Sequence, residues 1–428
     1  MRRRLALAAA LVPFTLVLGC AADGPGSPTP SGRTTEPSAT GSPSVDPAQV
    51  TSTWGPTLAE IQQAQELVAD WTPEQLAGQV IVGRFHGTDA AAAQQMVTDL
   101  HLAGMSVTTG NVVDEAQVRE FTAAIEAGVA ADGRDFPAVV GVDQEGGYVS
   151  HLRGVATEFP AFDAAGTAIE RDVRRGRDVT REAARTTALE ARDLGFTWIF
   201  APVADVTIGW ADPTIGSRSP STDPATASRA IAAAVRGYAD GAVVSTTKHF
   251  PGHGAATSDS HDTLPVLEAT REELAARDLV PFEGAIRSGA PAVMMSHLDV
   301  PAIEAGVPAS LSEPMYDLLR DDLGFEGVAI TDSLGMGAVA GIERPAVRAL
   351  QAGADLVLMP VDNVVTHQVI TDAIISGDIT RERIEEAAAR VVALQMSQQR
   401  RAAVRPVPED IATLAQEASA ALSAAAWQ

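Results

Sequence analysis

The feature that most limits the fold is a series of eight short apolar runs, separated by longer stretches rich in Ala, Glu and Arg. Val and Ile dominate the runs, and the stretches between them have the period of helices. Continuous apolar strands that alternate with helices indicate a parallel sheet buried on both faces. The runs cover residues 79–85, 103–109, 136–143, 196–206, 241–249, 291–300, 327–333 and 354–360. Eight such units predict an α/β fold of the (β/α)8 TIM-barrel type, with an open doubly wound sheet as the alternative.

Polar residues at the ends of these runs favour the barrel. Asp143, Asp205, Lys248 and Asp332 each stand where an apolar run ends. In a barrel the carboxyl ends of all strands meet on one face, where active sites lie. We therefore expect a single catalytic barrel domain over residues 57–428. After the last strand the pattern predicts two helices with a turn at 376–378, and one more helix from about residue 403.

The first 56 residues have a different character. Residues 1–20 combine a basic start, an apolar stretch and a small residue before Cys20, which is the layout of a secretory signal. The ending VLGC resembles the lipobox of bacterial lipoproteins, in which the cysteine is diacylated; an ordinary cleaved signal is the alternative. Residues 21–56 are rich in Pro, Ser, Thr and Gly and are expected to form a disordered tether. The sequence thus predicts a lipid anchor at Cys20, on the outer face of the cell membrane.

Charge and cysteine content limit the possible partners. The formal net charge is −24, whereas a nucleic-acid-binding surface must be basic, so no nucleic-acid partner is expected. Cys20 is the only cysteine, which excludes an intrachain disulfide and a cysteine-based metal site. We expect the protein to be a monomer.

Residues 245–262, STTKHFPGHGAATSDSHD, contain the only lysine of the chain, Lys248, and three of its eight histidines. A metal site fits poorly because this Gly- and Ser-rich loop offers no helical pairing of ligands, and its glycines match no phosphate-loop spacing. The interpretation that remains is a strand-end pair, Lys248 and His249, that contacts substrate. The loop that follows carries Asp259 and His261, and a carboxylate that orients an imidazole suits general acid/base catalysis.

The stretch KHFPGHGAATSDSHDTLP resembles the signature of the family 3 glycoside hydrolases, specifically their β-N-acetylglucosaminidase branch. DQEGG at 143–147, APVADV at 201–206, IGSRS at 215–219 and ITDSLGM at 330–336 match further motifs in the expected order. The resemblance covers the chain from about residue 57 and implies a (β/α)8 barrel. It implies that Asp332 is the nucleophile, that His261 is the acid/base and that Asp259 is its partner. The residues implied to hold the sugar are Asp143, Arg218, Lys248 and His249.

One departure from the family pattern concerns the sugar site. In much of this branch DQEGG is followed by R-V-x-R, and the second Arg also contacts the sugar. This chain reads DQEGGYVSHLRG, so His151 occupies that position. Arg153 lies two residues on, on the same side of an extended segment, and is a candidate replacement. Arg84 and His86 lie near the end of the first run. A place outside the site is expected for them, and a place at its rim is the alternative.

The resemblance implies a retaining exo-β-N-acetylglucosaminidase that acts through a covalent glycosyl-Asp332 intermediate. A tether outside the membrane suits peptidoglycan-derived GlcNAc-MurNAc fragments as substrates, and no metal or organic cofactor is implied. Two alternatives stay open. A histidine acid/base repels phosphate less than a carboxylate does, which allows a phosphorylase; an inactive sugar-binding lipoprotein is the other alternative. We also expect the loop of His261 to be open or disordered without ligand.

Overall fold

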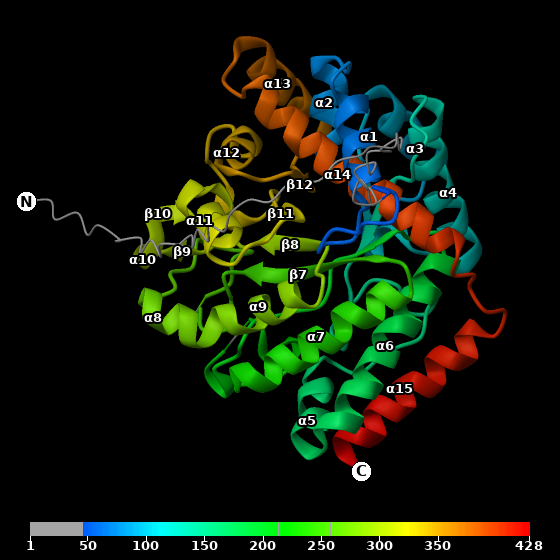
Figure 1. Ribbon diagram of the computed structural model, residues 1–428, viewed down its shortest axis with the longest axis vertical. Helices are drawn as coiled ribbons and strands as arrows, with labels where there is room; N and C mark the ends of the chain where they lie inside the picture. The colour runs from blue at the N-terminus through cyan, green and yellow to red at the C-terminus, as the bar shows by residue number, and fades with distance from the viewer. Residues whose placement is uncertain (1–45, 213, 257) are drawn as a thin grey trace, which may run out of the picture. The chain divides into compact units, whose positions relative to one another are not determined.

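The computed structural model describes residues 46–428, except residues 213 and 257 (Figure 1). The predicted signal peptide with Cys20, and the predicted tether as far as residue 45, lie outside the described residues. No helix within 46–428 is both long enough and apolar enough to cross a membrane.

Eight parallel strands of the described chain close into a barrel, which confirms the prediction of a (β/α)8 fold over an open sheet. Each predicted apolar run matches one of these strands, although β7 extends one residue beyond its run. Their order around the barrel is β1-β12-β11-β8-β7-β6-β3-β2, so the chain neighbours pair side by side and the first strand meets the last. The strands are β1 Ile81–Arg84, β2 Gly104–Val107, β3 Val139–Val142, β6 Trp198–Ile199, β7 Val244–Phe250, β8 Ala292–Met295, β11 Val328–Ser333 and β12 Leu356–Leu358.

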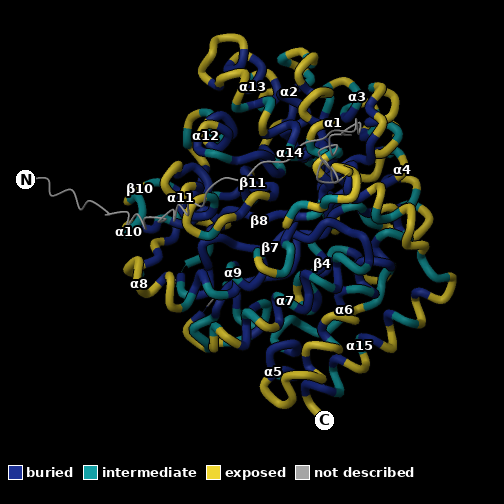
Figure 2. The backbone as a smooth tube through the Cα atoms, viewed as in Figure 1, coloured by how far each residue is buried: buried dark blue, intermediate teal, exposed yellow. Residues whose placement is uncertain are grey.

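Helices surround the barrel, and both faces of the strands are buried, as Figure 2 shows for β7, β8 and β11. All four residues of β3 and all seven of β7 are buried, which is why these runs read as continuous apolar sequence. The long helices are α1 Leu58–Val68, α2 Pro73–Gln79, α3 Ala90–Asp99, α4 Glu115–Ala131, α5 Asp163–Arg171, α6 Val173–Asp193, α7 Pro224–Asp240, α9 Leu279–Arg287, α12 Pro345–Ala352, α13 Asn363–Ser376, α14 Arg381–Ala403 and α15 Ile411–Trp427. Short helices are α8 Arg271–Glu273, α10 Pro301–Glu304 and α11 Glu313–Asp317.

Residues before the predicted boundary at residue 57 pack on the catalytic body. Trp54, which the sequence analysis placed in the tether, is only 6% exposed and belongs to the hydrophobic core. The carbonyl of Gly55 accepts a hydrogen bond of 3.1 Å from Arg400 of α14, and Thr53 donates one of 2.7 Å to Glu326. The predicted tether is therefore wrong over residues 46–56. The prediction rested on the Pro, Ser and Thr content of the segment and gave no weight to Trp54, which packs in the core.

The two helices predicted after the last strand are present as α13 and α14. Gly377 ends α13 with φ +82°, a conformation that favours glycine at a helix C-terminus. The last helix, α15, lies beside α5 and α6 (Figure 1). Leu422 of α15 is buried in a small cluster with alanines of α5 and α6. Ser419 donates a hydrogen bond of 2.9 Å to the carbonyl of Glu158. The C-terminal helix thus covers the segment that leads from β5 to α5.

Some elements differ from the predictions. The run 196–206 contributes only the two-residue strand β6, followed by an isolated bridge from Val203 to Lys248. Pro202 has no N–H to continue the ladder, which explains the early end. Two small antiparallel pairs were not predicted; both stand above the carboxyl ends of barrel strands. They are β4 Gln144–Gly146 with β5 Val149–Ser150, and β9 Asp299–Val300 with β10 Ala305–Pro308.

A buried ion cluster lies at the amino end of β12. Asp355 directly precedes this strand and is fully buried. Its carboxylate accepts hydrogen bonds from Arg320 at 2.7 Å, Arg383 at 3.0 Å and Arg390 at 2.7 Å. Burial alone would raise the pKa of Asp355, but the three guanidinium groups outweigh it and lower the pKa to about 2. This cluster ties α14 to the barrel floor.

Candidate active site

The predicted site residues come from different strands but meet at the carboxyl end of the barrel. Asp143 directly follows β3, Lys248 and His249 belong to β7, and Asp332 belongs to β11. Arg218 ends a short 3-10 turn, Gly216–Arg218, after β6. Parallel strands that close into a barrel bring all these positions to one face. The order of the strands, and not their distance in sequence, decides which of these side chains touch.

The lone lysine lies between two carboxylates. Lys248 Nζ is 2.6 Å from Glu145 Oε1 and also forms an ion pair with Asp143. Arg218 binds the same Glu145 with two hydrogen bonds, of 2.8 and 2.9 Å. Burial alone would raise the pKa of Glu145, yet Lys248 and Arg218 lower it to about 2, so Glu145 is ionised. The sequence analysis quoted Glu145 within the DQEGG motif but did not name it among the site residues.

The sequence analysis interpreted Lys248 as a residue that contacts substrate, whereas the structure places it between two carboxylates. The side chain of Lys248 is 3% exposed, and that of Asp143 is 18% exposed. Asp143 is therefore the member of the pair that reaches the solvent side of the network. A compact ammonium fits between two carboxylates that converge from one hairpin, where a planar guanidinium would need more room.

His249 is held by a second buried acid. Its Nδ1 lies 2.7 Å from Asp205 Oδ2, and its backbone N–H donates to the other oxygen of Asp205 at 3.1 Å. The backbone N–H of His253 donates to that same oxygen at 2.7 Å. Burial would raise the pKa of Asp205, but the two histidines and these N–H donors lower it. Because Asp205 fixes Nδ1 of His249 as the donor, Nε2 is left toward Arg218 and the barrel mouth.

Asp332 stands half-buried near the end of β11 and accepts a hydrogen bond of 2.8 Å from the N–H of Ser333. Burial would raise its pKa, but His249, His297, the Ser333 N–H and Lys248 together lower it, so Asp332 is an anion at neutral pH. His297 supports the same segment, because its Nε2 donates to the Ser333 carbonyl at 3.0 Å and its Nδ1 lies 2.7 Å from Ser310 Oγ. Burial lowers the pKa of His297.

The predicted dyad of Asp259 and His261 is formed. His261 Nδ1 lies 2.7 Å from Asp259 Oδ1, and the backbone N–H of His261 donates to the same oxygen at 2.9 Å. Asp259 therefore holds the ring by Nδ1 and leaves Nε2 free. The His261 side chain is 68% exposed, which places the imidazole in contact with solvent at the open end of the barrel.

The loop that carries this dyad lies against the segment after β11; that the loop is open or disordered without ligand stays a prediction. The carbonyl of His261 accepts from the N–H of Gly337 at 2.9 Å, and the carbonyl of Ser260 accepts from the N–H of Ala338 at 3.1 Å. The buried Ser260 side chain is also 3.1 Å from Nε2 of His253. The backbone of the acid/base loop and the segment that follows Asp332 thus form one hydrogen-bonded unit.

His151 and Arg153 lie apart from this network. His151 Nδ1 is 2.7 Å from Thr109 Oγ1. Arg153 is exposed and donates a hydrogen bond of 2.8 Å to the carbonyl of Gly147. Neither side chain has a hydrogen bond to Glu145 or to its partners in the described part of the chain. Whether either contacts a sugar stays a prediction.

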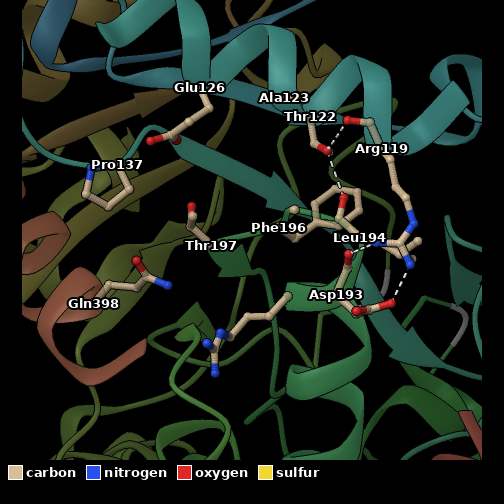
Figure 3. Close-up of a pocket in the computed structure, with 12 residues that line it drawn as sticks. Arg119, Thr122, Ala123, Glu126, Pro137, Asp193, Leu194, Phe196, Thr197 and Gln398 are labelled. Carbon is tan, nitrogen blue, oxygen red and sulfur yellow. Dashed lines mark hydrogen bonds and ion pairs between the residues drawn. The ribbon is translucent and has the colours of Figure 1, made fainter. Parts of the chain in front are cut away.

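Other features of the described chain do not add to the site. No group of three or more His, Cys, Asp or Glu side chains between residues 46 and 428 is arranged to hold a metal ion, residues 213 and 257 aside. A cavity of about 370 Å³ lies between α4 and the end of α6, and Figure 3 shows the residues that line it. Its lining includes Pro137 and Thr197, which precede β3 and β6. This cavity therefore lies at the amino end of the strands, opposite the catalytic groups.

Comparison with known proteins decides the family. Residues 63–394 match the model described as the glycosyl hydrolase family 3 N terminal domain. The chain belongs to glycoside hydrolase family 3. The resemblance given by the sequence motifs is thereby confirmed at the level of the family, and the closed barrel is the fold expected for this domain.

Named relatives of this family 3 chain include beta-hexosaminidases. Beta-hexosaminidase LpqI of Mycobacterium tuberculosis is 35% identical over 342 residues, which cover 75% of this chain and 82% of LpqI. Beta-hexosaminidase of Stenotrophomonas maltophilia is 36% identical over 262 residues, or 60% of this chain and 76% of the relative. A solved family 3 beta-N-acetylglucosaminidase from Paenibacillus sp. superposes with a TM-score of 0.75 at 33% identity. That superposition covers 82% of this chain and 69% of the Paenibacillus chain.

Proposed function

We propose that this protein is a retaining exo-β-N-acetylglucosaminidase that removes GlcNAc from the non-reducing end of its substrates. The observation that carries the proposal is the pairing of an ionised strand-end carboxylate, Asp332, with the Asp259–His261 dyad on a loop bonded to the segment after Asp332. The relatives named beta-hexosaminidases support the proposed substrate class.

The first step forms a bond between Asp332 and the anomeric carbon while the glycosidic bond breaks. His261, protonated and held at Nδ1 by Asp259, gives the Nε2 proton to the departing oxygen, so the aglycone leaves as a neutral alcohol. In the second step, neutral His261 takes a proton from water, the resulting hydroxide attacks the anomeric carbon, and Asp332 leaves as a carboxylate. His261 gives a proton in the first step and takes one in the second. Asp332 bonds to the sugar in the first step and leaves it in the second, so both groups return to their starting state.

The sugar would be held at the wall of the barrel formed by β3 and β7. Asp143 offers a carboxylate oxygen to sugar hydroxyls, and its partner Lys248 fixes its place. His249 offers its Nε2 and Arg218 offers N–H groups at the same wall. Because Glu145 already orients Arg218 and Asp205 already orients His249, little side-chain freedom is lost when substrate binds.

The substrate class and the cellular location belong to the same proposal. The basic and apolar residues 1–20, ending in VLGC, support a lipoprotein signal with lipidation at Cys20. A lipid anchor would hold the enzyme on the outer side of the membrane, as a monomer on a tether that ends near residue 45. Peptidoglycan-derived fragments of GlcNAc-MurNAc type are the β-GlcNAc substrates expected in that location.

A phosphorylase is the second candidate, and one observation favours it. The acid/base is an imidazole, His261, where many retaining glycosidases have a second carboxylate. A neutral imidazole repels a phosphate dianion less, so phosphate could take the place of water in the second step. An inactive sugar-binding lipoprotein would keep the barrel but would not turn substrate over.

The test is turnover of chromogenic β-GlcNAc and β-glucose by residues 46–428, with and without phosphate. We expect release from the GlcNAc substrate only, no acceleration by phosphate, and loss of at least about a thousandfold in kcat with Asp332→Ala. A fluorinated GlcNAc inactivator should add its sugar mass to Asp332 in a peptide digest. Acceleration by phosphate with formation of a sugar phosphate would select the phosphorylase. An Asp332→Ala variant as active as the native protein would contradict the assigned nucleophile.

A further inference from the structure

Arg84 is a guanidinium at the barrel mouth that the proposed mechanism does not use. It is the last residue of β1, and its backbone is fixed on both sides by one side chain of α13. The N–H of Arg84 donates to Asn363 Oδ1 at 3.2 Å, and Asn363 Nδ2 donates to the Arg84 carbonyl at 2.7 Å. The strand end therefore gives the Arg84 side chain a defined starting point.

The direction of this side chain follows from its neighbour. A Cβ atom at Gly83 would lie 2.9 Å from Leu102, which belongs to the hydrophobic core, and 3.3 Å from Asn363, the first residue of the surrounding helix α13. Gly83 thus faces outward, and because successive residues of a strand alternate, Arg84 faces the inside of the barrel. A Cβ atom at Gly335 would lie 3.0 Å from Nη2 and 3.1 Å from Nη1 of Arg84. The guanidinium therefore rests on the backbone three residues after Asp332.

The barrel order places Arg84 opposite the wall proposed for the sugar. β1 and β7 are four strands apart in both directions around the closed barrel. Arg84, at the end of β1, and Lys248, in β7, accordingly stand on opposite sides of the mouth. Asp332, in β11, lies between them, two strands from each. A sugar held by the β7 wall would direct the group beyond its scissile bond toward Arg84.

Arg84 differs from the other cations of the site because its charge is not matched within the protein. Its guanidinium has no hydrogen bond and no ion pair with any residue that the structure describes, and it is only half-buried. Lys248 and Arg218 by contrast share carboxylates of the DQEGG segment. A guanidinium offers five N–H donors in a fork that matches the oxygens of a carboxylate or a phosphate. An inward, unpaired and backbone-fixed guanidinium is arranged for an anion that arrives with the substrate.

We propose that Arg84 binds an oxyanion next to the scissile bond and so selects substrates whose leaving group carries a carboxylate. This inference rests on the proposed function and narrows its substrate class to acidic aglycones, of which the lactyl group of MurNAc is one. The same chemistry would hold free phosphate as a co-substrate. The carboxylated aglycone is the source favoured here, because an aglycone bound by its own carboxylate stays in register with the glycosidic bond that His261 must protonate.

The first test compares two substrates that differ only in charge, GlcNAc-β-1,4-MurNAc and its lactyl methyl ester. We expect the native protein to prefer the acid by about ten- to hundredfold in kcat/KM, mostly through KM, as for a hydrogen bond to a charged group. Arg84→Gln should remove that preference, and Arg84→Lys should restore part of it. Arg348→Gln, an exposed arginine on α12, is the matched control and should keep the preference. An unchanged ratio of acid to ester in Arg84→Gln would overturn the proposal.

A second test separates the two sources of the anion and does not need turnover. Calorimetry on Asp332→Asn measures binding of N-acetylmuramic acid and of inorganic phosphate, with and without Arg84→Gln. If N-acetylmuramic acid binds more tightly with Arg84 than with Arg84→Gln, the result supports an aglycone carboxylate as the ligand. If only phosphate shows this difference, phosphate is the ligand instead. If Arg84→Gln changes neither affinity, the anion site is refuted. A native protein that cleaves no β-GlcNAc substrate refutes the proposed function instead, and this calorimetry still reports on Arg84.

Discussion

Gly337 is the point at which the acid/base loop touches the segment that follows the nucleophile. A Cβ atom there would lie 2.6 Å from the carbonyl oxygens of both His261 and Asp262. These are backbone atoms, which cannot turn away as the end of a flexible side chain can. In Gly337→Ala the loop must retreat by roughly 0.8 Å to reach an ordinary contact near 3.4 Å, and it loses the 2.9 Å bond to the His261 carbonyl.

The expected consequence is a selective loss of proton transfer. A misplacement of about 1 Å in a catalytic group can cost about a hundredfold in rate. We expect kcat/KM for a GlcNAc disaccharide, whose leaving group needs a proton, to fall about 30- to 100-fold in Gly337→Ala. A dinitrophenyl β-GlcNAc, whose leaving group departs without a proton, should lose less than about threefold in kcat/KM.

The measurement is kcat/KM on these two substrates, together with thermal unfolding of each variant. Gly110→Ala is the matched control, because its new Cβ would have only Thr108 Oγ1 nearby, at 3.9 Å, in another loop at the same end of the barrel. It should leave both substrates unaffected. Equal losses on both substrates would mean that Asp332 was displaced, and full activity on the disaccharide would refute the role given to the contact at Gly337.

Three further predictions concern the body of the enzyme. Trp54→Ala should lower the free energy of unfolding by about 3–5 kcal/mol in urea denaturation, because the side chain is in the core; a change below about 1 kcal/mol would restore the longer tether. Glu145→Gln should cost about 3–5 kcal/mol, because Lys248 and Arg218 keep their charges without a full partner. The same change should lower kcat/KM at least about tenfold. A Glu145→Gln variant with native stability and native kcat/KM would contradict the role given to this network. The pKa of Asp355 is lower in the folded chain than in the unfolded one, so its stabilisation is complete above the unfolded pKa and declines as the pH falls toward 2. Stability of the native protein should fall by about 2–3 kcal/mol from this source between pH 5 and pH 2, and Asp355→Asn should lack that part of the pH dependence in a denaturation series.

Much of this protein could be read from its sequence. Strands buried on both faces need unbroken apolar runs, so all eight barrel strands were visible, and so was the polar residue that ends most of them. The Asp259–His261 dyad was also accessible, because its two members are only two residues apart and local geometry brings them together. Boundaries were less accessible: Trp54 belongs to the core although it lay within the predicted tether, and Pro202 shortens β6.

Only the tertiary structure decided which charged groups pair with one another. Lys248 and Asp143 are 105 residues apart, and Arg218 and Glu145 are 73 apart, yet all four form one network. The direction of Arg84 and the close approach of Gly337 to the acid/base loop were equally hidden. Sequence patterns report what each segment buries, since that depends on local period and composition. Contacts between segments depend on the closure and stagger of the barrel, which join strands that are far apart in the chain.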